Sequence, residues 1–424
     1  MAQELTEKRG NIYSDRPSLP MFDLLGWKDT LITMPYGDQF RKHRRMMNSV
    51  LSEKAVDSFR HIQSKSALLF IKLLTSEPEV DLERHISCYT AATIMKIAYG
   101  HDVESLEDPI VKLSLEALTK TLEFGTVSTT VVDFVPALAH IPAWFPFAGF
   151  KRRALALREK VERSQSLPYK TVQQKMRDGD APDCFVTRNI YDCGGLDSLT
   201  QQDEKDIQGA AAALYTAAEE TTLAVVHAFF LAMLLNPDVY RRAQEEMENV
   251  VGYDRLPDPD DMTSLPYLDA VMRELYRWTA PTSINAPHKT KEDDIYRGYF
   301  IPKGTNVIVN NFGLLRACPD PDLFLPQRFL DGTNLGKVPT NPRDIVFGFG
   351  RRRCPGWHFA DRSVWVAAAY ITALFDILPE IDESGCEVIP PMAFGTSNVR
   401  HPKPFKCRIT PRKDRKQLLE EILR

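Results

Sequence analysis

The chain has 424 residues, of which 43% are hydrophobic and 10% aromatic, so it can bury a large core and is too apolar for a disordered protein. The formal net charge of −4 provides no general basic field, which excludes nucleic acid as an expected partner. The seven cysteines are dispersed, without a Cys-x-x-Cys pair or a metal-type Cys/His spacing, which predicts reduced thiols in a cytosol-facing protein.

In chain order, the first segment is MAQELTEKRGNIYSDRP, which lacks an apolar stretch and therefore predicts neither a signal peptide nor an anchor helix there. Helical periodicity follows over much of the chain, separated by Pro/Gly-rich connectors. The predicted helices cover residues 50–74, 87–99, 110–121, 151–165, 205–235, 238–251, 268–278 and 357–375. Residues 295–310 alternate like a hairpin, and residues 404–411 form another candidate strand. These patterns predict a mainly α fold with a small β part, folded as one unit over 1–424.

The predicted helix 205–235 differs from the others because it is apolar on nearly all sides. About 30 helical residues extend roughly 45 Å, so this helix is expected to cross the core. Its middle nevertheless carries Glu219, Glu220, Thr221 and Thr222. Acidic side chains at that depth are costly unless they face a cavity or a partner, which marks this helix as a candidate functional element.

The stretch FGFGRRRCPG, residues 347–356, places Cys354 behind three arginines and between Gly350 and Gly356. Glycines permit tight turns, and backbone N–H groups and arginines beside a sulfur favour its thiolate form. Such a loop is suited to hold a thiolate near a flat cofactor. The alternative is a buried structural cysteine after a basic surface turn.

The loop fits Phe-x-x-Gly-x-Arg-x-Cys-x-Gly, and in this respect the chain resembles the cytochrome P450 family. Four further stretches resemble family motifs in family order: FRKHR (40–44), AAEET (217–221), ELYR (274–277) and PQRF (326–329). Phe40, Ala218 and Gln327 stand where the family has tryptophan, glycine and glutamate. The resemblance covers essentially the whole chain. It implies the cytochrome P450 fold, with the long helix over the haem and the cysteine loop on its proximal side.

The resemblance implies that Cys354 is the axial ligand of haem b iron, where a thiolate donates electron density and favours O–O cleavage. Arg352 and Arg44 are then the expected propionate partners. His288 in APHKT is a third candidate, with an ordinary hydrogen-bonded histidine as the alternative. Phe347 is expected beside the thiolate, although a plain core aromatic would have the same pattern. Gly350 and Gly356 complete the expected cofactor loop, and the neighbouring Arg351 and Arg353 are either solvated or form a basic patch for an electron donor.

The resemblance also implies roles for the other motifs. Glu274 and Arg277 would form a buried structural triad with Arg328, whereas alone they would suggest a surface salt bridge. Thr221, whose hydroxyl can bond back to the Ala217 carbonyl, and Glu220 are the expected proton-guiding pair. Ala218 would narrow the groove beside them.

The implied activity is hydroxylation of a small lipophilic metabolite by O₂, with electrons from NADPH delivered by NADPH-cytochrome P450 reductase. The stretches 141–152, 298–305 and 400–412 are similar to fungal secondary-metabolite members of the O-methylsterigmatocystin oxidoreductase-like group. Relatives of this kind have an endoplasmic-reticulum anchor and a first β region that are not seen here, and residues 314–324 are shorter than in the family. Two alternative functions therefore stay open: a haem-thiolate isomerase or dehydratase, and a truncated relative without catalysis. Peripheral contact with a membrane also stays open.

Overall fold

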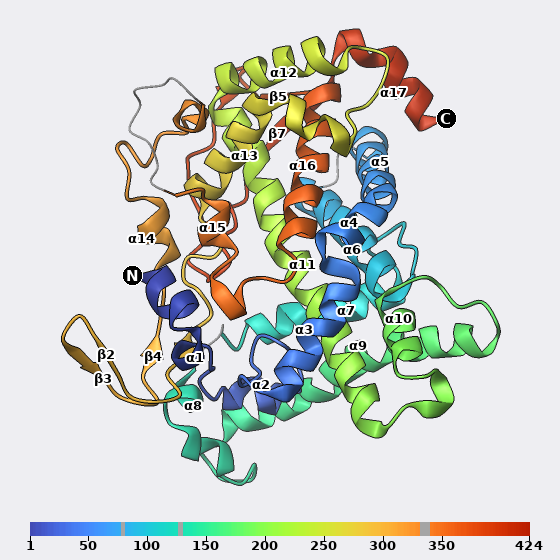
Figure 1. The fold of residues 1–424 in the computed structure, drawn as a ribbon. Coiled ribbons are helices and arrows are strands. Elements are labelled where there is room, and N and C mark those ends of the chain that lie inside the picture. The colour runs from blue at the N-terminus through green and yellow to red at the C-terminus, as the bar shows by residue number, and fades with distance from the viewer. Residues whose placement is uncertain (78–80, 126–129, 331–339) are drawn as a thin grey trace.

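The computed structural model describes residues 1–77, 81–125, 130–330 and 340–424, and helices make up most of it (Figure 1). The α-helices are α1 Gly10–Tyr13, α2 Pro20–Leu25, α3 Asp38–Leu51, α4 Glu53–Ser58, α5 Arg60–Ser76, α6 Leu82–Tyr99, α7 Pro109–Leu122, α8 Val131–Phe134, α9 Gly149–Arg177, α10 Phe185–Asp192, α11 Gln201–Leu235, α12 Pro237–Val251, α13 Pro266–Thr279, α14 Asn311–Leu315, α15 Arg343–Val346, α16 Trp357–Leu374 and α17 Lys416–Leu423. Short π or 3₁₀ turns are η1 Glu4–Lys8, η2 Pro136–His140, η3 Leu196–Ser198, η4 Pro259–Ser264, η5 Pro326–Phe329, η6 Gly350–Arg352 and η7 Lys413–Arg415.

The β part consists of three small antiparallel sheets within the described residues. Strand β1 His288–Lys289 pairs with β4 Asn306–Val307, and β2 Asp294–Tyr296 pairs with β3 Tyr299–Ile301 in a hairpin. Strand β5 Phe375–Ile381 lies between β6 Glu387–Val388 and β7 Cys407–Pro411. The predicted hairpin over 295–310 is therefore correct only for its first half, because its second half returns to pair with residues 288–289.

Helix α11 runs through the molecule and packs against α6, α16, α9, α13 and α3 (Figure 1). A capping box formed by Thr200 and Asp203 starts it four residues before the predicted position, because the Thr200 hydroxyl accepts from the Asp203 N–H. By length and composition this helix could cross a membrane, but 78% of its apolar window is buried inside the protein. The prediction that it crosses the core is confirmed.

The largest differences from the predicted helices lie at residues 50–74 and 151–165. The single helix expected over 50–74 is wrong, since the backbone is extended at Ser52 and breaks again at Phe59 to give α3, α4 and α5. Helix α9 continues to Arg177 with Pro168 inside it, whereas the prediction ended at residue 165. A proline only disfavours a helix interior, and here Tyr169 and Val172 continue the buried face.

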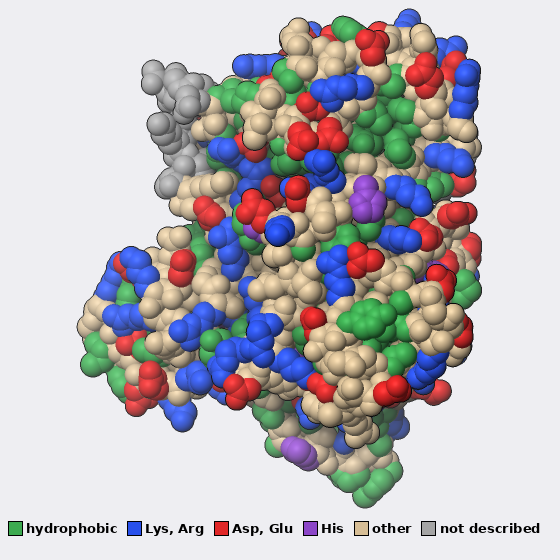
Figure 2. All heavy atoms as spheres, turned by 45° about the vertical axis from the view of Figure 1, so that its right-hand side comes forward, with side chains coloured by type: hydrophobic (Ala, Val, Ile, Leu, Met, Phe, Trp, Pro, Cys, Tyr) green, Lys and Arg blue, Asp and Glu red, His purple; other side chains and the backbone are tan. Residues whose placement is uncertain are grey.

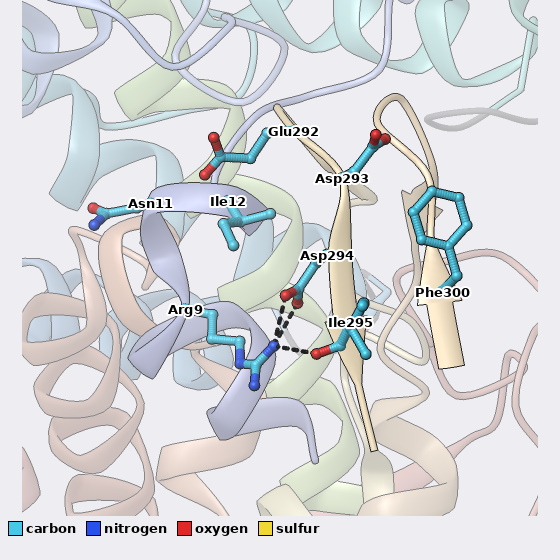
Figure 3. Close-up of a pocket in the computed structure, with 8 residues that line it drawn as sticks. All are labelled: Arg9, Asn11, Ile12, Glu292, Asp293, Asp294, Ile295 and Phe300. Carbon is cyan, nitrogen blue, oxygen red and sulfur yellow. Dashed lines mark hydrogen bonds and ion pairs between the residues drawn. The ribbon is translucent and has the colours of Figure 1, made fainter. Parts of the chain in front are cut away.

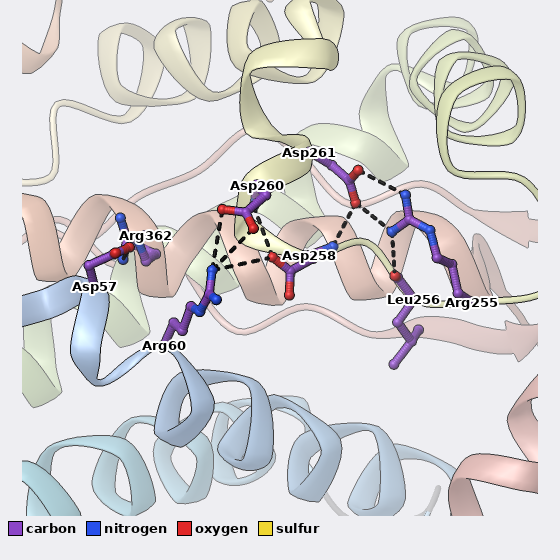
Figure 4. Close-up of polar contacts among 8 residues, drawn as sticks. All are labelled: Asp57, Arg60, Arg255, Leu256, Asp258, Asp260, Asp261 and Arg362. Atoms are coloured by element: carbon purple, nitrogen blue, oxygen red, sulfur yellow. Dashed lines mark hydrogen bonds and ion pairs between the residues drawn. The ribbon is translucent and has the colours of Figure 1, made fainter.

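Two groups of polar contacts join separate elements at the surface. Arg9 on the N-terminal segment donates to Asp294 at 2.7 Å and to the Ile295 carbonyl at 3.0 Å, which joins this segment to the β2–β3 hairpin (Figure 3). On another face, Arg60 of α5 bonds to Asp260 of η4 and Arg362 of α16 bonds to Asp57 of α4 (Figure 4). Such exposed pairs each contribute less than about 1 kcal/mol, so they align elements that the core already holds.

Candidate active site

A cavity of about 300 Å³ lies between α11 and the cysteine loop. Helix α11 contributes Ala217, Ala218 and Thr221 to its wall, and the loop contributes Phe347, Arg352, Cys354 and Gly356. Phe40 and Arg44 reach it from α3. A concave, mainly apolar wall with a few convergent polar groups is typical of small-molecule and cofactor sites.

The Cys354 side chain enters this cavity from a constrained loop. Its backbone N–H donates to the Phe347 carbonyl at 2.7 Å, which closes the turn. Burial raises the pKa of the Cys354 thiol, whereas the Gly356 N–H and the charges of Arg44 and Arg353 lower it. A Cβ on Gly356 would lie 3.9 Å from the sulfur, in ordinary contact. Of the groups proposed from the sequence to favour a thiolate, a loop N–H and Arg353 act on the sulfur, whereas Arg352 donates to the Ser14 and Met34 carbonyls and Arg351 donates to Asn11.

Three arginines from distant parts of the chain converge on the cavity and are held by backbone carbonyls. Arg44 donates to the Arg353 carbonyl at 2.7 Å, and Arg352 donates to the Ser14 and Met34 carbonyls at 2.7 and 2.8 Å. Arg352 also stacks on the Phe40 ring at 3.9 Å. Arg16 donates to the Ala286 and Pro287 carbonyls at 2.6 and 2.8 Å. Carbonyls orient these guanidinium groups without neutralising their charge.

These three charges have no carboxylate within ion-pair distance among the described residues, although Asp15 acts electrostatically on Arg16 and Arg352 and raises the pKa of both. Burial lowers the pKa of Arg16 to about 9 and that of Arg352 to about 10, and it also lowers the pKa of Arg44. Nη1 of Arg352 is buried without a hydrogen-bond partner. Since a buried unpaired cation is costly, the site fits a group that carries carboxylates. A haem, with two propionates and an iron for Cys354, meets that requirement.

The other residues expected at the cofactor lie as follows. Phe347 lines the cavity and packs edge-on against Tyr276, with ring centroids 5.7 Å apart. His288 lies behind the cavity wall, with Nδ1 2.7 Å from the Tyr13 carbonyl, and burial lowers its pKa to about 4, so its ring is neutral at pH 7. Gly350 faces the N-terminal segment, where a Cβ would lie 2.5 Å from the Thr6 carbonyl oxygen. The structure thus brings Phe347 to the cavity, whereas His288 and Gly350 do not line it.

On the opposite wall, α11 presents Thr221 to the cavity. Its hydroxyl donates to the Ala217 carbonyl at 2.7 Å, which is the bond the sequence predicted. Glu220 points elsewhere, with Oε1 3.7 Å from Nε2 of His401. The buried Glu219 accepts from the Ser87 hydroxyl at 2.9 Å, and burial raises its pKa to about 7. The two expected proton-guiding residues are adjacent in sequence, but only Thr221 lines the cavity.

The expected structural triad is assembled at the end of α13. Arg277 donates to both Glu274 oxygens at 2.6 and 2.8 Å, and Arg328 of η5 lies 3.5 Å from the same carboxylate. Glu274 also accepts from the Leu325 N–H at 2.7 Å. Arg277 and Glu274 are fully buried, so they join α13 to the segment that leads into the cysteine loop.

Sequence reasoning missed Arg16, the Ser87 partner of Glu219, and His401. Arg16 lies in SDRP, where no local pattern distinguishes it from a surface arginine. Ser87 was inside a predicted helix and His401 beside a predicted strand, again without a distinctive spacing. For Glu219, the sequence did offer a signal, because an acidic residue in the middle of a helix that is apolar on nearly all sides is expected to be buried.

A comparison with known proteins identifies the family. A family model of cytochrome P450 matches residues 1–408. The chain belongs to the cytochrome P450 family. The cytochrome P450 monooxygenase eriC of Hericium erinaceus is 43% identical over 420 residues, which are 98% of this chain and 82% of the relative. Cytochrome P450 monooxygenases 136 and 176 of Postia placenta are 39% and 37% identical, over 97% and 99% of this chain and 78% and 82% of their own lengths.

These findings confirm the resemblance and the mainly α P450 fold inferred from the sequence. The protein is a P450 monooxygenase, an oxidoreductase. Membership of the P450 family implies a haem cofactor, and in general terms the use of O₂ and of a redox partner.

Proposed function

We propose that this P450 hydroxylates a small lipophilic secondary metabolite, with haem b held by Cys354 and electrons delivered from NADPH by NADPH-cytochrome P450 reductase. The observation that carries the proposal is the convergence on one mainly apolar cavity of Cys354, Thr221 and three arginines without an ion-pair partner among the described residues. We also propose that residues 1–424 act as one catalytic domain that faces the cytosol.

Each residue has a distinct role in this proposal. The haem supplies reductive activation of O₂, and a thiolate ligand favours O–O cleavage. Cys354 would be the iron ligand, and Arg16, Arg44 and Arg352 would bind the propionates. Phe347 and Phe40 exclude water. Ala217 and Ala218 line the cavity next to Thr221, whose hydroxyl is placed to hold a water or pass a proton. The remaining apolar wall selects for a lipophilic substrate.

Peripheral membrane contact is supported by an apolar region around α8 and η2. Phe134, Trp144 and Phe147 are 70%, 79% and 82% exposed. Hydrophobic side chains are visible at the lower tip in Figure 2, the part of the molecule that carries α8 in Figure 1. Elsewhere on the face in Figure 2, basic and acidic side chains intermingle, in keeping with the small net charge.

The absorption spectrum of the reduced protein with CO tests the proposal, because its red-shifted band requires haem with a thiolate ligand. We expect Cys354→Ser to abolish the band, since an alcohol is a far weaker donor than a thiolate. Cys318→Ser, the matched sulfur-to-oxygen change in RACPDPD, is expected to keep it. If well-folded wild-type protein lacked the band, the alternative of a non-catalytic relative would be favoured. If product formed without a reductase, an isomerase or dehydratase would be favoured.

A further inference from the structure

Helix α3 carries cavity residues on one face and a set of polar side chains on another. Phe40 and Arg44 are four residues apart, so both lie on the face that lines the cavity. Lys42 and His43 follow Gln39 by three and four residues, so these three share a second face. The second face packs against the start of α11, where its polar side chains meet one buried carboxylate.

That carboxylate belongs to Asp206 of α11, which is 1% exposed. Its Oδ2 accepts from Nζ of Lys42 at 2.6 Å, and its Oδ1 accepts from Nε2 of Gln39 at 3.0 Å. Nε2 of His43 lies 3.1 Å from the same Oδ1 and donates to it, because an ionised carboxylate only accepts. Gln202, one turn earlier on α11, donates to Oδ1 at 2.9 Å. Three of these four donors come from α3.

The charges of this cluster are matched inside the protein. Burial raises the pKa of Asp206, but the bonds from Lys42 and the other donors outweigh burial, so the carboxyl is ionised at pH 7. Burial lowers the pKa of His43, and its ring is therefore neutral at pH 7. Lys42 also donates to Asp203 at 2.7 Å, in the capping box that starts α11. Loss of the Asp206 charge would leave buried donors without their acceptor, which is unfavourable.

The cluster is next in the chain to a proposed haem contact. His43 and Arg44 are consecutive, and consecutive side chains on a helix point about 100° apart. His43 is held at Asp206, while the Arg44 guanidinium donates to the Arg353 carbonyl of the cysteine loop at 2.7 Å. A helical turn moves as a unit, so a shift of α3 at Asp206 would displace Phe40 and Arg44 relative to the cysteine loop.

Other polar contacts of α3 hold its far end. Arg188 of α10 donates to the Ser49 carbonyl at 3.0 Å, and Nδ2 of Asn189 donates to the Ser49 hydroxyl at 3.4 Å. Ser49 lies in the last turn of α3, beyond Arg44. The bonds to Asp206 are therefore the ones that hold the half of the helix from which Arg44 extends.

We propose that Asp206 is a positioning residue for the cofactor, which anchors the second face of α3 and thereby holds Arg44 toward a haem propionate. The inference rests on the proposed assignment of Arg44 to the propionates. Asp206 does not line the cavity, so it acts through α3. A carboxylate with a structural role alone would change the stability of the fold, but its effect on haem binding would not depend on Arg44.

The test is a double-mutant cycle on the rate of haem transfer from the holoenzyme to excess apomyoglobin. Groups that orient the binding residues of a metal site contribute about 10- to 100-fold, so we expect Asp206→Asn to lose haem about tenfold faster than the wild type. The double variant Asp206→Asn/Arg44→Gln should lose haem no faster than Arg44→Gln alone. A wild-type rate in Asp206→Asn, or a double variant accelerated by the product of the single effects, would overturn the inference.

Glu248→Gln is the matched control. Glu248 of α12 accepts from Arg412 and Tyr253 and does not line the cavity. This change should lower the free energy of unfolding and leave the rate of haem transfer unchanged. An acceleration equal to that of Asp206→Asn would show a general loosening of the fold and would overturn the inference.

Two milder variants serve if Asp206→Asn does not accumulate as holoenzyme. His43→Gln keeps an N–H group that can donate to Asp206, whereas His43→Leu removes it. His43→Gln should therefore lose haem more slowly than His43→Leu. Equal rates in the two variants would count against the anchor.

A second measurement does not depend on haem loss. In the resonance Raman spectrum of the ferric holoenzyme, the propionate bending bands respond to hydrogen bonds at the propionates. These bands should shift in the same direction in Asp206→Asn and Arg44→Gln and stay in place in Glu248→Gln. Unshifted bands in Asp206→Asn would overturn the inference. Absence of the thiolate CO band from the wild type would instead overturn the proposed function.

Discussion

Gly350 of the cysteine loop lies directly against the backbone of Thr6. Its φ is +54°, and a Cβ there would lie 2.5 Å from the Thr6 carbonyl oxygen and 2.8 Å from Cα of Glu7. The loop that presents Cys354 is therefore packed under the N-terminal segment, at a distance that only glycine permits. The N-terminal residues help to fix the proposed haem ligand although they do not line the cavity.

Gly350→Ala is accordingly expected to destabilise the holoenzyme by about 1–3 kcal/mol from backbone strain, with the steric contact added to it. Gly385→Ala provides the control, because Gly385 also has a positive φ, +81°, but has open space where the Cβ would lie. Denaturant unfolding should give a larger loss for Gly350→Ala. Equal losses would show that the contact with Thr6 is unimportant.

Arg16→Gln should weaken haem retention about 10- to 100-fold, because a charge-assisted hydrogen bond contributes about 1.5–3 kcal/mol. The rate of haem transfer to excess apomyoglobin measures this effect. Arg158→Gln, which removes an exposed arginine paired with Glu162 on α9, should leave the rate unchanged. Wild-type haem retention in Arg16→Gln would remove this residue from the propionate site.

Arg277→Ala should cost about 3–5 kcal/mol, since it leaves the fully buried Glu274 carboxylate without its main partner. Arg241 and Asp238 form a pair at the same i,i+3 spacing, but their side chains are 69% and 89% exposed. Arg241→Ala should therefore change the free energy of unfolding by less than about 1 kcal/mol. The two variants are compared by denaturant unfolding, and a similar small cost for both would contradict a structural role for the triad.

Glu219 should make stability depend on pH. Burial raises the pKa of Glu219 to about 7 from its ordinary value of 4.5, so the folded state holds the proton more tightly than the unfolded chain. The resulting stabilisation is complete below about pH 4.5 and is lost as the pH rises to about 7, a change on the order of 3 kcal/mol. Glu219→Gln lacks this group. Its unfolding free energy relative to the wild type should therefore rise between pH 5 and pH 8, and a constant difference over this range would contradict the raised pKa.

The cysteine loop and most of the long helices could be predicted from the sequence because they depend on local patterns. Each of these patterns lies within one continuous segment of the chain. This holds for the residue order of FGFGRRRCPG and for the apolar periodicity of α6, α7, α12 and α16. The bond from Thr221 to Ala217 could be predicted for the same reason, since a helix places a residue next to the carbonyl four positions earlier. Strand β5 was not predicted, because its pairing with β7 depends on residues far along the chain.

The sequence by itself determined the helical class, the cysteine loop and the residues that form the triad. Only the tertiary structure decided which charges share the cavity and where each carboxyl on α11 points. Arg16, Arg44 and Arg352 come from three segments of the chain. Their shared cavity, and the lack of an ion-pair partner among the described residues, become evident only when burial and nearby acids such as Asp15 are known. Likewise, helical spacing separates Glu219 from Glu220, but the partners Ser87 and His401 are supplied by packing. The energy of a buried charge depends on the groups that surround it in space. Many of these groups lie far from it in the sequence, so a local sequence pattern does not identify them.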